Sequence, residues 1–216
     1  MITATFALKK KQMKNILLIN GHEFYEFAKG QYNQTLFKVH EDILSKQFNI
    51  TKTIIEDGYD IAEEQEKFKR ADIIVFQFPV YWFGMPAALK KYIDVVYAYG
   101  VFFGMGNESS QAGEQPKYGF SNGLMPGKKY MLSITTNAPN EVFNDEDGFF
   151  EGKDLEGFLF NVHKTHQFCG MTPLKSFAAD NVIKNPQPEA HSKDLEVHLK
   201  STIVTPFAKP RQAAKL

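Results

Sequence analysis

Short apolar runs alternate along the chain with stretches whose apolar residues recur every three or four positions. The runs NILLIN (15–20), DIIVFQF (72–78) and KYMLSITT (129–136) are typical of strands buried on both faces of a parallel sheet. The run FNITKTII (48–55) alternates apolar and polar residues, which predicts a more exposed strand. A fifth, short strand is expected near 174–177.

Helical periodicity fills most of the intervals between these runs. It predicts helices at 32–44, 63–70, 85–96, 155–168 and 189–204, with Gly100 as the cap of the third helix. Strands that alternate with helices predict an α/β domain with a mostly parallel sheet and helices on both faces. The interval 101–127, with six glycines and two prolines, has little periodicity and is too long for a simple turn.

The chain of 216 residues fits one large domain, which we place at 14–205. The ends, 1–13 and 206–216, are basic and unpatterned, and we expect a disordered N-terminal extension and a flexible C-terminal tail. Met13 is a candidate natural start.

Composition narrows the class of function. Basic and acidic residues balance at 25 each, so no net field attracts nucleic acid. No apolar run is long enough to cross a bilayer, no secretory leader is recognisable, and the single cysteine fits a reducing compartment, so we expect a cytoplasmic protein. The aromatic content of 14% supplies flat apolar surface for a core, an interface or a planar ligand.

The loop after the first strand is a candidate phosphate site by its position. It leads into a helix N-terminus, where free N–H groups and the helix dipole favour an anion. It has no GxGxxG or GxxxxGK[ST] motif and no Ser or Thr between Gly21 and Gln34. A bridging pyrophosphate could be held by N–H groups, Lys29 and the amides of Gln31 and Asn33. The alternative is an ordinary connection that Gly30 merely eases.

Two further loops are expected at the same edge of the sheet. The loop after the third strand carries Tyr81, Trp82 and Phe83, which could form the wall of a planar ring site. The loop after 129–136 offers the hydroxyl and amide groups of 135–137. Ligands of parallel α/β sheets bind beyond the carboxyl ends of the strands, so the three loops together predict a nucleotide or flavin pocket. The alternative for the aromatic residues is burial under a neighbouring loop.

Other chemistries have weaker support. No GxSxG elbow is present, and the acidic run 144–148 lacks the spacing of a calcium loop and is expected to be a solvated loop. Cys169 has no charged neighbour in sequence and is expected to be a buried packing residue. No cysteine pair or HExxH motif accompanies four helical histidines, which are expected to face solvent: His163, His166, His191 and His198.

Six stretches in order resemble the flavodoxin-like quinone reductases, specifically the bacterial modulator of drug activity B family. They are NILLINGHE, KGQYNQTL, ADIIVFQFPVYWFGMPAALKKYID, KYGFSNGLMPGKKYMLSITTNAP, FFEGKDLEGF and HKTHQFCGMTPL, and the likeness spans about 14–205. The resemblance implies a flavodoxin-like doubly wound fold with a five-stranded parallel sheet in the order 2-1-3-4-5. It also implies FAD as the cofactor.

The resemblance further implies an NADPH:quinone oxidoreductase that protects against quinone stress. NADPH gives a hydride to the flavin and leaves, and a quinone then takes two electrons in the same space. A homodimer with sites at the interface is implied, with 101–127 as site wall and dimer element. The residues implied to bind the cofactor are Ala28, Lys29, Gly30, Gln31, Tyr32, Asn33, Gln34, Thr35, Pro79, Val80, Tyr81, Trp82, Tyr118, Thr135, Thr136, Asn137 and Ala138.

Ala28 stands where close relatives can carry a serine, and Lys29 is expected to supply charge in place of that hydrogen bond. Two other functions are compatible with the fold: an FMN-dependent azoreductase and a flavodoxin-type electron carrier. Zero net charge argues against the carrier, because such carriers are usually strongly acidic to steer docking. The absence of a hydroxyl-rich phosphate loop argues the same way.

Overall fold

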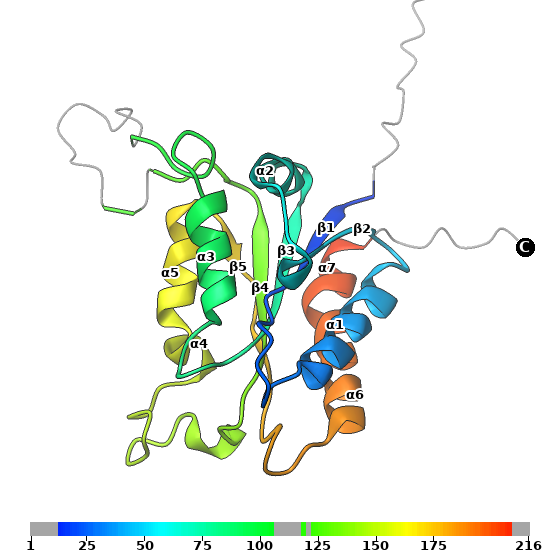
Figure 1. Cartoon of the computed structure of the whole chain (residues 1–216), viewed down its shortest axis with the longest axis vertical. Coiled ribbons are helices and arrows are strands. Elements are labelled where there is room, and N and C mark those ends of the chain that lie inside the picture. The colour runs from blue at the N-terminus through cyan, green and yellow to red at the C-terminus, as the bar shows by residue number, and fades with distance from the viewer. Residues whose placement is uncertain (1–12, 106–117, 120–121, 209–216) are drawn as a thin grey trace, which may run out of the picture.

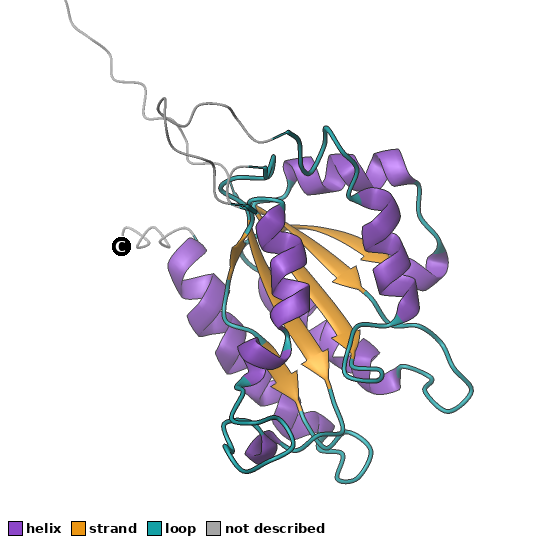
Figure 2. Cartoon of the chain, turned by 90° about the vertical axis from the view of Figure 1, so that its left-hand side faces the viewer, coloured by secondary structure: helices purple, strands orange, loops and turns teal. Residues whose placement is uncertain are grey.

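A parallel sheet forms the centre of the molecule (Figure 2). The computed structural model describes residues 13–105, 118–119 and 122–208, so most of the two expected flexible ends lies outside the described residues. The long strands are β1 (Asn15–Asn20), β2 (Asn49–Ile54), β3 (Ile73–Pro79) and β4 (Lys129–Thr135). Together with β5 (Thr172–Pro173), they pair in parallel in the order β2-β1-β3-β4-β5, which confirms the predicted topology.

The fifth strand differs from its prediction, because it forms two short pieces rather than one strand at 174–177. β5 (Thr172–Pro173) and β6 (Phe177–Ala179) both pair with β4. Pro173 has no N–H to continue the ladder, and the backbone N–H of Ser176 donates instead to the Glu156 carboxylate at 2.8 Å. These two residues divide the strand.

Helices cover both faces of the sheet (Figure 1). The helices are α1 (Gln31–Leu44), α2 (Ile61–Arg70), α3 (Ala87–Val96), α4 (Leu155–Phe158), α5 (Phe160–Phe168), α6 (Pro188–Leu199) and α7 (Thr205–Phe207). Leu17 and Ile19 pack with α2, α3 and α5, whereas Ile16 and Leu18 pack with α1 and α6. Both faces of β1 are therefore buried, as its continuous apolar run predicts. Among the described helices, none is long and apolar enough to span a bilayer.

Three helix boundaries differ from the periodicity. The predicted helix 155–168 is interrupted at Leu159, and the predicted helix 189–204 ends at 199, where a π-helical turn (200–204) leads into α7. Helical structure therefore reaches Phe207, past the expected end of the domain. α3 ends at Val96, before the expected cap Gly100, because Tyr97 leaves the helical conformation and its ring stacks on Phe102 at 4.1 Å.

Candidate functional site

A cavity of about 540 Å³ opens at the carboxyl edge of the sheet, where the three loops meet. Thirteen of the predicted residues line it: Ala28, Lys29, Gly30, Gln31, Tyr32, Asn33, Thr35, Pro79, Val80, Tyr81, Thr135, Thr136 and Asn137. Five further lining residues are not among those predicted: His22, Phe27, Val182, Ile183 and Pro188. Of these, His22 carries the clearest signal, because it lies two residues after the end of the first strand and its Nε2 lies 3.0 Å from the Ala28 carbonyl oxygen.

Four predicted residues do not line this cavity. Gln34 lies in an adjoining hollow, and the backbone N–H of Ala138 donates to Thr136 Oγ1 at 3.1 Å. Trp82 lies in the loop that follows β3 and is 95% exposed. Tyr118 is 90% exposed beside Phe168, with ring centroids 6.0 Å apart. Because α5 ends where β5 begins, Tyr118 lies at the amino edge of the parallel sheet, opposite the cavity.

Gly30 caps α1 at the cavity with a backbone that a side chain would disrupt. Its φ is +75°, and a Cβ there would lie 2.5 Å from the imidazole of His22. The glycine thus allows His22 to pack directly under the turn. Gly30 therefore has a specific packing role, in contrast to the alternative of an ordinary strand-to-helix connection. No side chain among the described residues caps the helix, and its first N–H groups meet the cavity, an arrangement that suits an anion.

The adjoining hollow extends the cavity along the phosphate loop toward the end of β2. It measures about 390 Å³ and shares His22, Lys29, Gly30 and Gln31 with the main cavity. The two form a trench around the N-terminus of α1. Lys29 is an exposed cation in both, so the trench carries positive charge where its two parts meet.

A buried polar network supports the first turn of α1 from below. Asn20, Gln77 and Ser133 are neighbours in register across the three central strands. Asn33 Nδ2 donates to Asn20 Oδ1 at 2.8 Å, and Gln77 Nε2 donates to Asn33 Oδ1 at 3.0 Å. The Asn33 amide therefore faces the sheet rather than the cavity, so the proposal that it holds a phosphate does not fit this geometry.

His40 extends this network on α1. Its Nε2 lies 3.2 Å from Gln77 Oε1, which also accepts from the Ser133 hydroxyl at 2.7 Å. Burial lowers the pKa of His40 to about 4, and the like charge of His198 acts in the same direction. His40 is therefore a neutral structural donor at physiological pH.

The aromatic loop forms a tight turn in which Tyr81 and Gly84 exchange backbone hydrogen bonds. The two residues between them, Trp82 and Phe83, have φ of +48° and +64°. Positive φ at both central positions is the pattern of a type I′ turn, which favours Gly, Asn and Asp. Trp82 is not buried under a neighbouring loop, whereas Phe83 stacks on Phe149 at 5.5 Å.

Glu23 connects the phosphate loop to the aromatic loop. Its carbonyl oxygen accepts from the Tyr81 hydroxyl at 3.0 Å, and its carboxylate accepts from the N–H of Ala88 in the first turn of α3 at 2.9 Å. Burial, with Tyr25 and Glu23 adding to it, raises the pKa of Tyr81 to about 12, so the phenol stays protonated. The two loops are thus held at a fixed separation.

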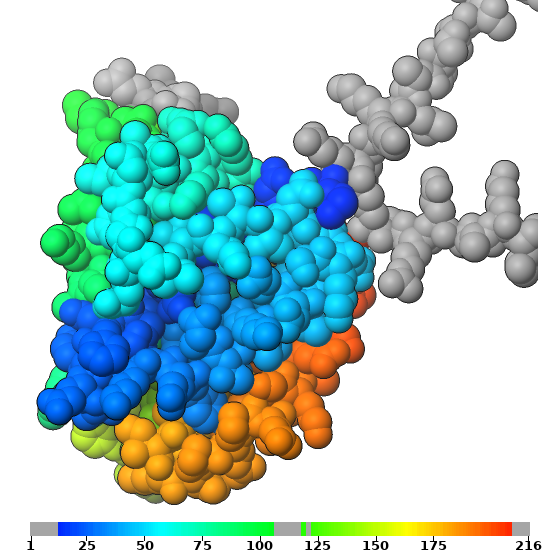
Figure 3. Space-filling model, turned by 45° about the vertical axis from the view of Figure 1, so that its right-hand side comes forward, coloured from blue at the N-terminus to red at the C-terminus, as the bar shows by residue number. Residues whose placement is uncertain are grey.

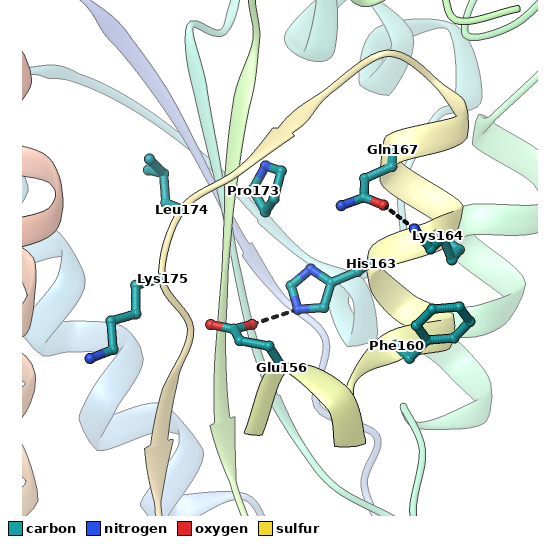
Figure 4. A pocket seen from close by; sticks show the side chains of 8 residues that line it. All are labelled: Glu156, Phe160, His163, Lys164, Gln167, Pro173, Leu174 and Lys175. Carbon is teal, nitrogen blue, oxygen red and sulfur yellow. Dashed lines mark hydrogen bonds and ion pairs between the residues drawn. The ribbon is translucent and has the colours of Figure 1, made fainter. Parts of the chain in front are cut away.

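The histidines of α5 are buried, so the expectation that His163 and His166 are solvated is wrong. His163 Nδ1 lies 2.8 Å from the Tyr130 hydroxyl, and its Nε2 lies 2.7 Å from Glu156 (Figure 4). His166 Nδ1 lies 2.9 Å from the Tyr97 hydroxyl, and burial lowers its pKa to about 3. The tyrosine partners come from distant segments, which sequence spacing does not reveal.

Figure 4 shows a separate cavity of about 370 Å³ between α5 and the β5–β6 connection. It shares no lining residue with the carboxyl-edge cavity. Hydrogen bonds from His163 and Ser176, opposed by burial, lower the pKa of Glu156. The carboxylate therefore serves as an internal clamp between α4, α5 and β6.

The histidines of α6 also differ from the expectation of surface residues. His191 is largely buried between Tyr32 and Asp180, and His198 Nε2 lies 2.9 Å from the Lys175 carbonyl oxygen. Cys169 is buried as predicted, and burial raises its thiol pKa to about 12. Across the described residues, no group of three or more potential metal ligands is present.

Comparisons with known proteins agree with this architecture. Residues 14–201 match the family with a flavodoxin-like fold. NADPH:quinone oxidoreductase MdaB of Haemophilus influenzae is 39% identical over 189 residues, covering 86% of this chain and 97% of that protein. A solved structure of a provisionally assigned quinone reductase from Klebsiella pneumoniae superposes with a TM-score of 0.71 at 23% identity, covering 92% of this chain and 87% of the other.

A more distant structure contains a flavin. General stress protein 14 of Treponema denticola, solved in complex with FMN, has a TM-score of 0.59 at 20% identity and covers 87% of this chain and 94% of its own. At this identity the likeness concerns the fold. The family match over most of the chain and the 39% identical relative establish the kinship, and the chain belongs to the flavodoxin-like fold family.

Proposed function

We propose that this protein is a flavin-dependent NADPH:quinone oxidoreductase that reduces quinones by two electrons and protects the cell against quinone stress. The observation that carries the proposal is the carboxyl-edge cavity, which joins a helix N-terminus to an aromatic wall. The 39% identity to a quinone oxidoreductase over nearly that protein's whole length supports the same activity. The single, buried cysteine favours the reducing cytoplasm as its compartment.

We propose FAD rather than FMN as the cofactor. FMN ends in a single phosphate with about two negative charges, which normally recruits hydroxyl groups and several cations. The first turn of α1 offers N–H groups and Lys29, with the imidazole of His22 under the turn. A bridging diphosphate fits this sparser set, and the hollow beyond it provides space for the adenosine end. FMN in the Treponema denticola protein makes FMN the alternative.

When bound, the flavin supplies hydride acceptance and hydride donation. The residues of this chain bind and orient it. Lys29 and the N–H groups of the first helical turn would bind the diphosphate, and residues 79–81 would form the wall beside the ring system. Thr135, Thr136 and Asn137 would contact the ring system from the other side. Tyr81, held by Glu23, keeps this wall rigid.

The open rim of the cavity is the proposed place for NADPH and the quinone in turn. Phe27 lines the cavity and exposes 87% of its surface, and Trp82, next in sequence to the cavity-lining Tyr81, exposes 95%. We propose that both rings supply flat apolar area for a nicotinamide or a quinone. One site that serves two planar substrates in succession gives ping-pong kinetics. No protein acid or base is required for this transfer.

We also propose a homodimer in which the site is completed by the second copy. Tyr118 is implied to contact the cofactor, yet it lies at the edge of the sheet opposite its own cavity. It could reach a flavin only across a subunit boundary. Exposed Tyr99, Met105 and Leu124 in the same part of the chain supply apolar area for such a contact.

Two measurements test the function. Flavin extracted from the purified protein is identified by its mass as FAD or FMN. This result distinguishes the proposed FAD-dependent quinone reductase from an FMN-dependent azoreductase. Stopped-flow mixing with NADPH, followed by a quinone, should bleach the flavin and then restore its colour. Failure of NADPH to bleach the bound flavin would remove the proposed NADPH-dependent activity, and a protein that takes up no flavin has neither function.

A further inference from the structure

Three polar side chains from separate elements form a hydrogen-bonded chain at the cavity. The Tyr32 hydroxyl of α1 bonds to His191 Nδ1 of α6, and His191 Nε2 lies 3.2 Å from Asp180 Oδ1, directly after β6. Tyr32 itself lines the cavity. Figure 3 shows the surfaces of the first loop and α1 (blue) and of α6 (orange) side by side. We name this chain of residues the Tyr32 relay.

Asp180 extends the Tyr32 relay to the third loop. Its Oδ2 accepts from the backbone N–H of Asn140 at 3.1 Å and from Asn181 Nδ2 at 3.0 Å. Asn137 Oδ1 in the same loop accepts from the backbone N–H groups of residues 183 and 184. The relay therefore links the phosphate side of the cavity to the side that residues 135–138 form.

The burial of the relay indicates a positioning role. The side chains of His191 and Asp180 are only 12% and 14% exposed, although neither belongs to an apolar core cluster. Withdrawing an imidazole and a carboxylate from water costs free energy that their mutual contact only partly offsets. A direct consequence of the arrangement is that the first turn of α1 is held against α6.

We propose that His191 and Asp180 are positioning residues for the phosphate-binding turn, acting through the Tyr32 hydroxyl. This inference rests on the proposed flavin function and deepens it, because it names residues that hold the diphosphate end in particular. Tyr32 is the second residue of α1, so a shift of its side chain moves the N–H groups that face the anion. The far wall, formed by residues 79–81, would hold the flavin ring, so binding of the ring would depend less on this turn.

The experiment compares FAD with riboflavin, which has the same ring but no phosphate. Tyr32→Phe and His191→Phe each remove one end of the Tyr32–His191 bond while keeping a ring of similar size. His198→Phe is the matched control, since His198 is on the same helix and also hydrogen-bonded, to the Lys175 carbonyl oxygen. Affinities are measured on apoprotein by quenching of flavin fluorescence, with the melting temperature recorded for each variant.

We expect Tyr32→Phe and His191→Phe to weaken FAD about tenfold, as the loss of one hydrogen bond would. Riboflavin affinity should stay within about twofold, and the double variant should be no weaker than either single one because both break the same bond. Equal weakening of FAD and riboflavin, unchanged FAD affinity, or an equal effect of His198→Phe would overturn the inference. Wild-type protein that binds neither flavin defeats the proposed function itself, which the wild-type measurement alone reveals.

Discussion

Trp82 holds a backbone conformation that costs free energy and exposes nearly all of its side chain. Positive φ in a bulky residue costs of order 1–3 kcal/mol, and such residues persist mainly where function uses them. With 95% of its surface exposed, the Trp82 ring makes few contacts within the chain to offset this cost. The strain is therefore best explained by a role on the rim of the cavity.

Replacing Trp82 by Asn should separate stability from activity. Asn tolerates positive φ, so the melting temperature should hold or rise by a few degrees, corresponding to about 1 kcal/mol. Loss of the exposed ring should lower kcat/KM for the quinone roughly tenfold. Glu151→Asn is the control, because Glu151 has φ of +51° in an exposed loop and does not line the cavity. Equal activity in both variants would remove Trp82 from the site.

His40 makes the stability of the protein depend on pH. Burial lowers its pKa from 6.5 to about 4, so the unfolded chain binds a proton more readily than the folded one. The stabilisation is complete above about pH 6.5 and is lost as the pH falls toward 4. A shift of this size corresponds to roughly 3 kcal/mol.

Urea unfolding of wild type and His40→Gln between pH 7 and pH 4 measures this contribution. The variant can still donate to Gln77 but cannot titrate, so its free energy of unfolding should fall less steeply with decreasing pH. Protonation of the other titratable groups should lower the free energy of unfolding equally in both proteins. Parallel curves for the two proteins would show that His40 does not titrate abnormally.

At the scale of elements, the start of α1 depends on Gly30 and His22 together. Many helices begin with a side-chain cap, whereas this one begins with a left-handed glycine packed on an imidazole. The helix end is thereby left open to the cavity. From sequence alone, the loop before α1 resembles an ordinary connection. The packing of His22 against Gly30 is a tertiary contact, which the sequence pattern does not reveal.

Gly30→Ala and Gly58→Ala form a matched pair that tests this site. Both glycines have positive φ, and a Cβ at Gly58 would meet no atom within 4 Å. Each substitution should cost about 1–2 kcal/mol of stability from backbone strain. Only Gly30→Ala also displaces His22, so it alone should weaken FAD binding. The loss of about one contact corresponds to a decrease in affinity of roughly tenfold or more. Equal FAD affinity in the two variants would contradict this site.

At the scale of the whole molecule, the proposed homodimer would account for both the exposed apolar surface and the position of Tyr118. A single chain places its cavity and Tyr118 at opposite edges of the sheet. A two-fold dimer brings the same patch of each chain to the other, which can pair each cavity with the partner's Tyr118. In that proposed dimer, the apolar side chains exposed after α3 would become buried.

Co-expression of Gly30→Ala and Tyr118→Ala chains with different tags tests the shared site. The mixed dimer contains one site with an intact cavity and the other chain's Tyr118. It should regain about half of wild-type activity, whereas each variant alone should be roughly tenfold less active. Sedimentation should give twice the chain mass of 24.6 kDa. A monomer, or a mixture no better than its parts, would show that each chain carries a complete site.

Local sequence pattern specifies the class of the fold and the edge of the sheet where the cavity opens. Continuous apolar runs can be buried only between two layers, so β1, β3 and β4 follow from local pattern, as does the cavity beyond their carboxyl ends. The sequence also predicts that Cys169 is a buried packing residue, since it has no charged neighbour in the sequence.

Tertiary structure alone decided which polar side chains face the cavity and which are buried. Asn33 turns toward the sheet, His22 packs under Gly30, and His191 bonds to Tyr32, although none of these partners is close in sequence. The buried histidines of α5 were misjudged for the same reason, because their tyrosine partners lie on β4 and after α3. Periodicity reports only whether a position is apolar, whereas a polar residue is buried when a distant partner satisfies it, and that pairing exists only once the chain has folded.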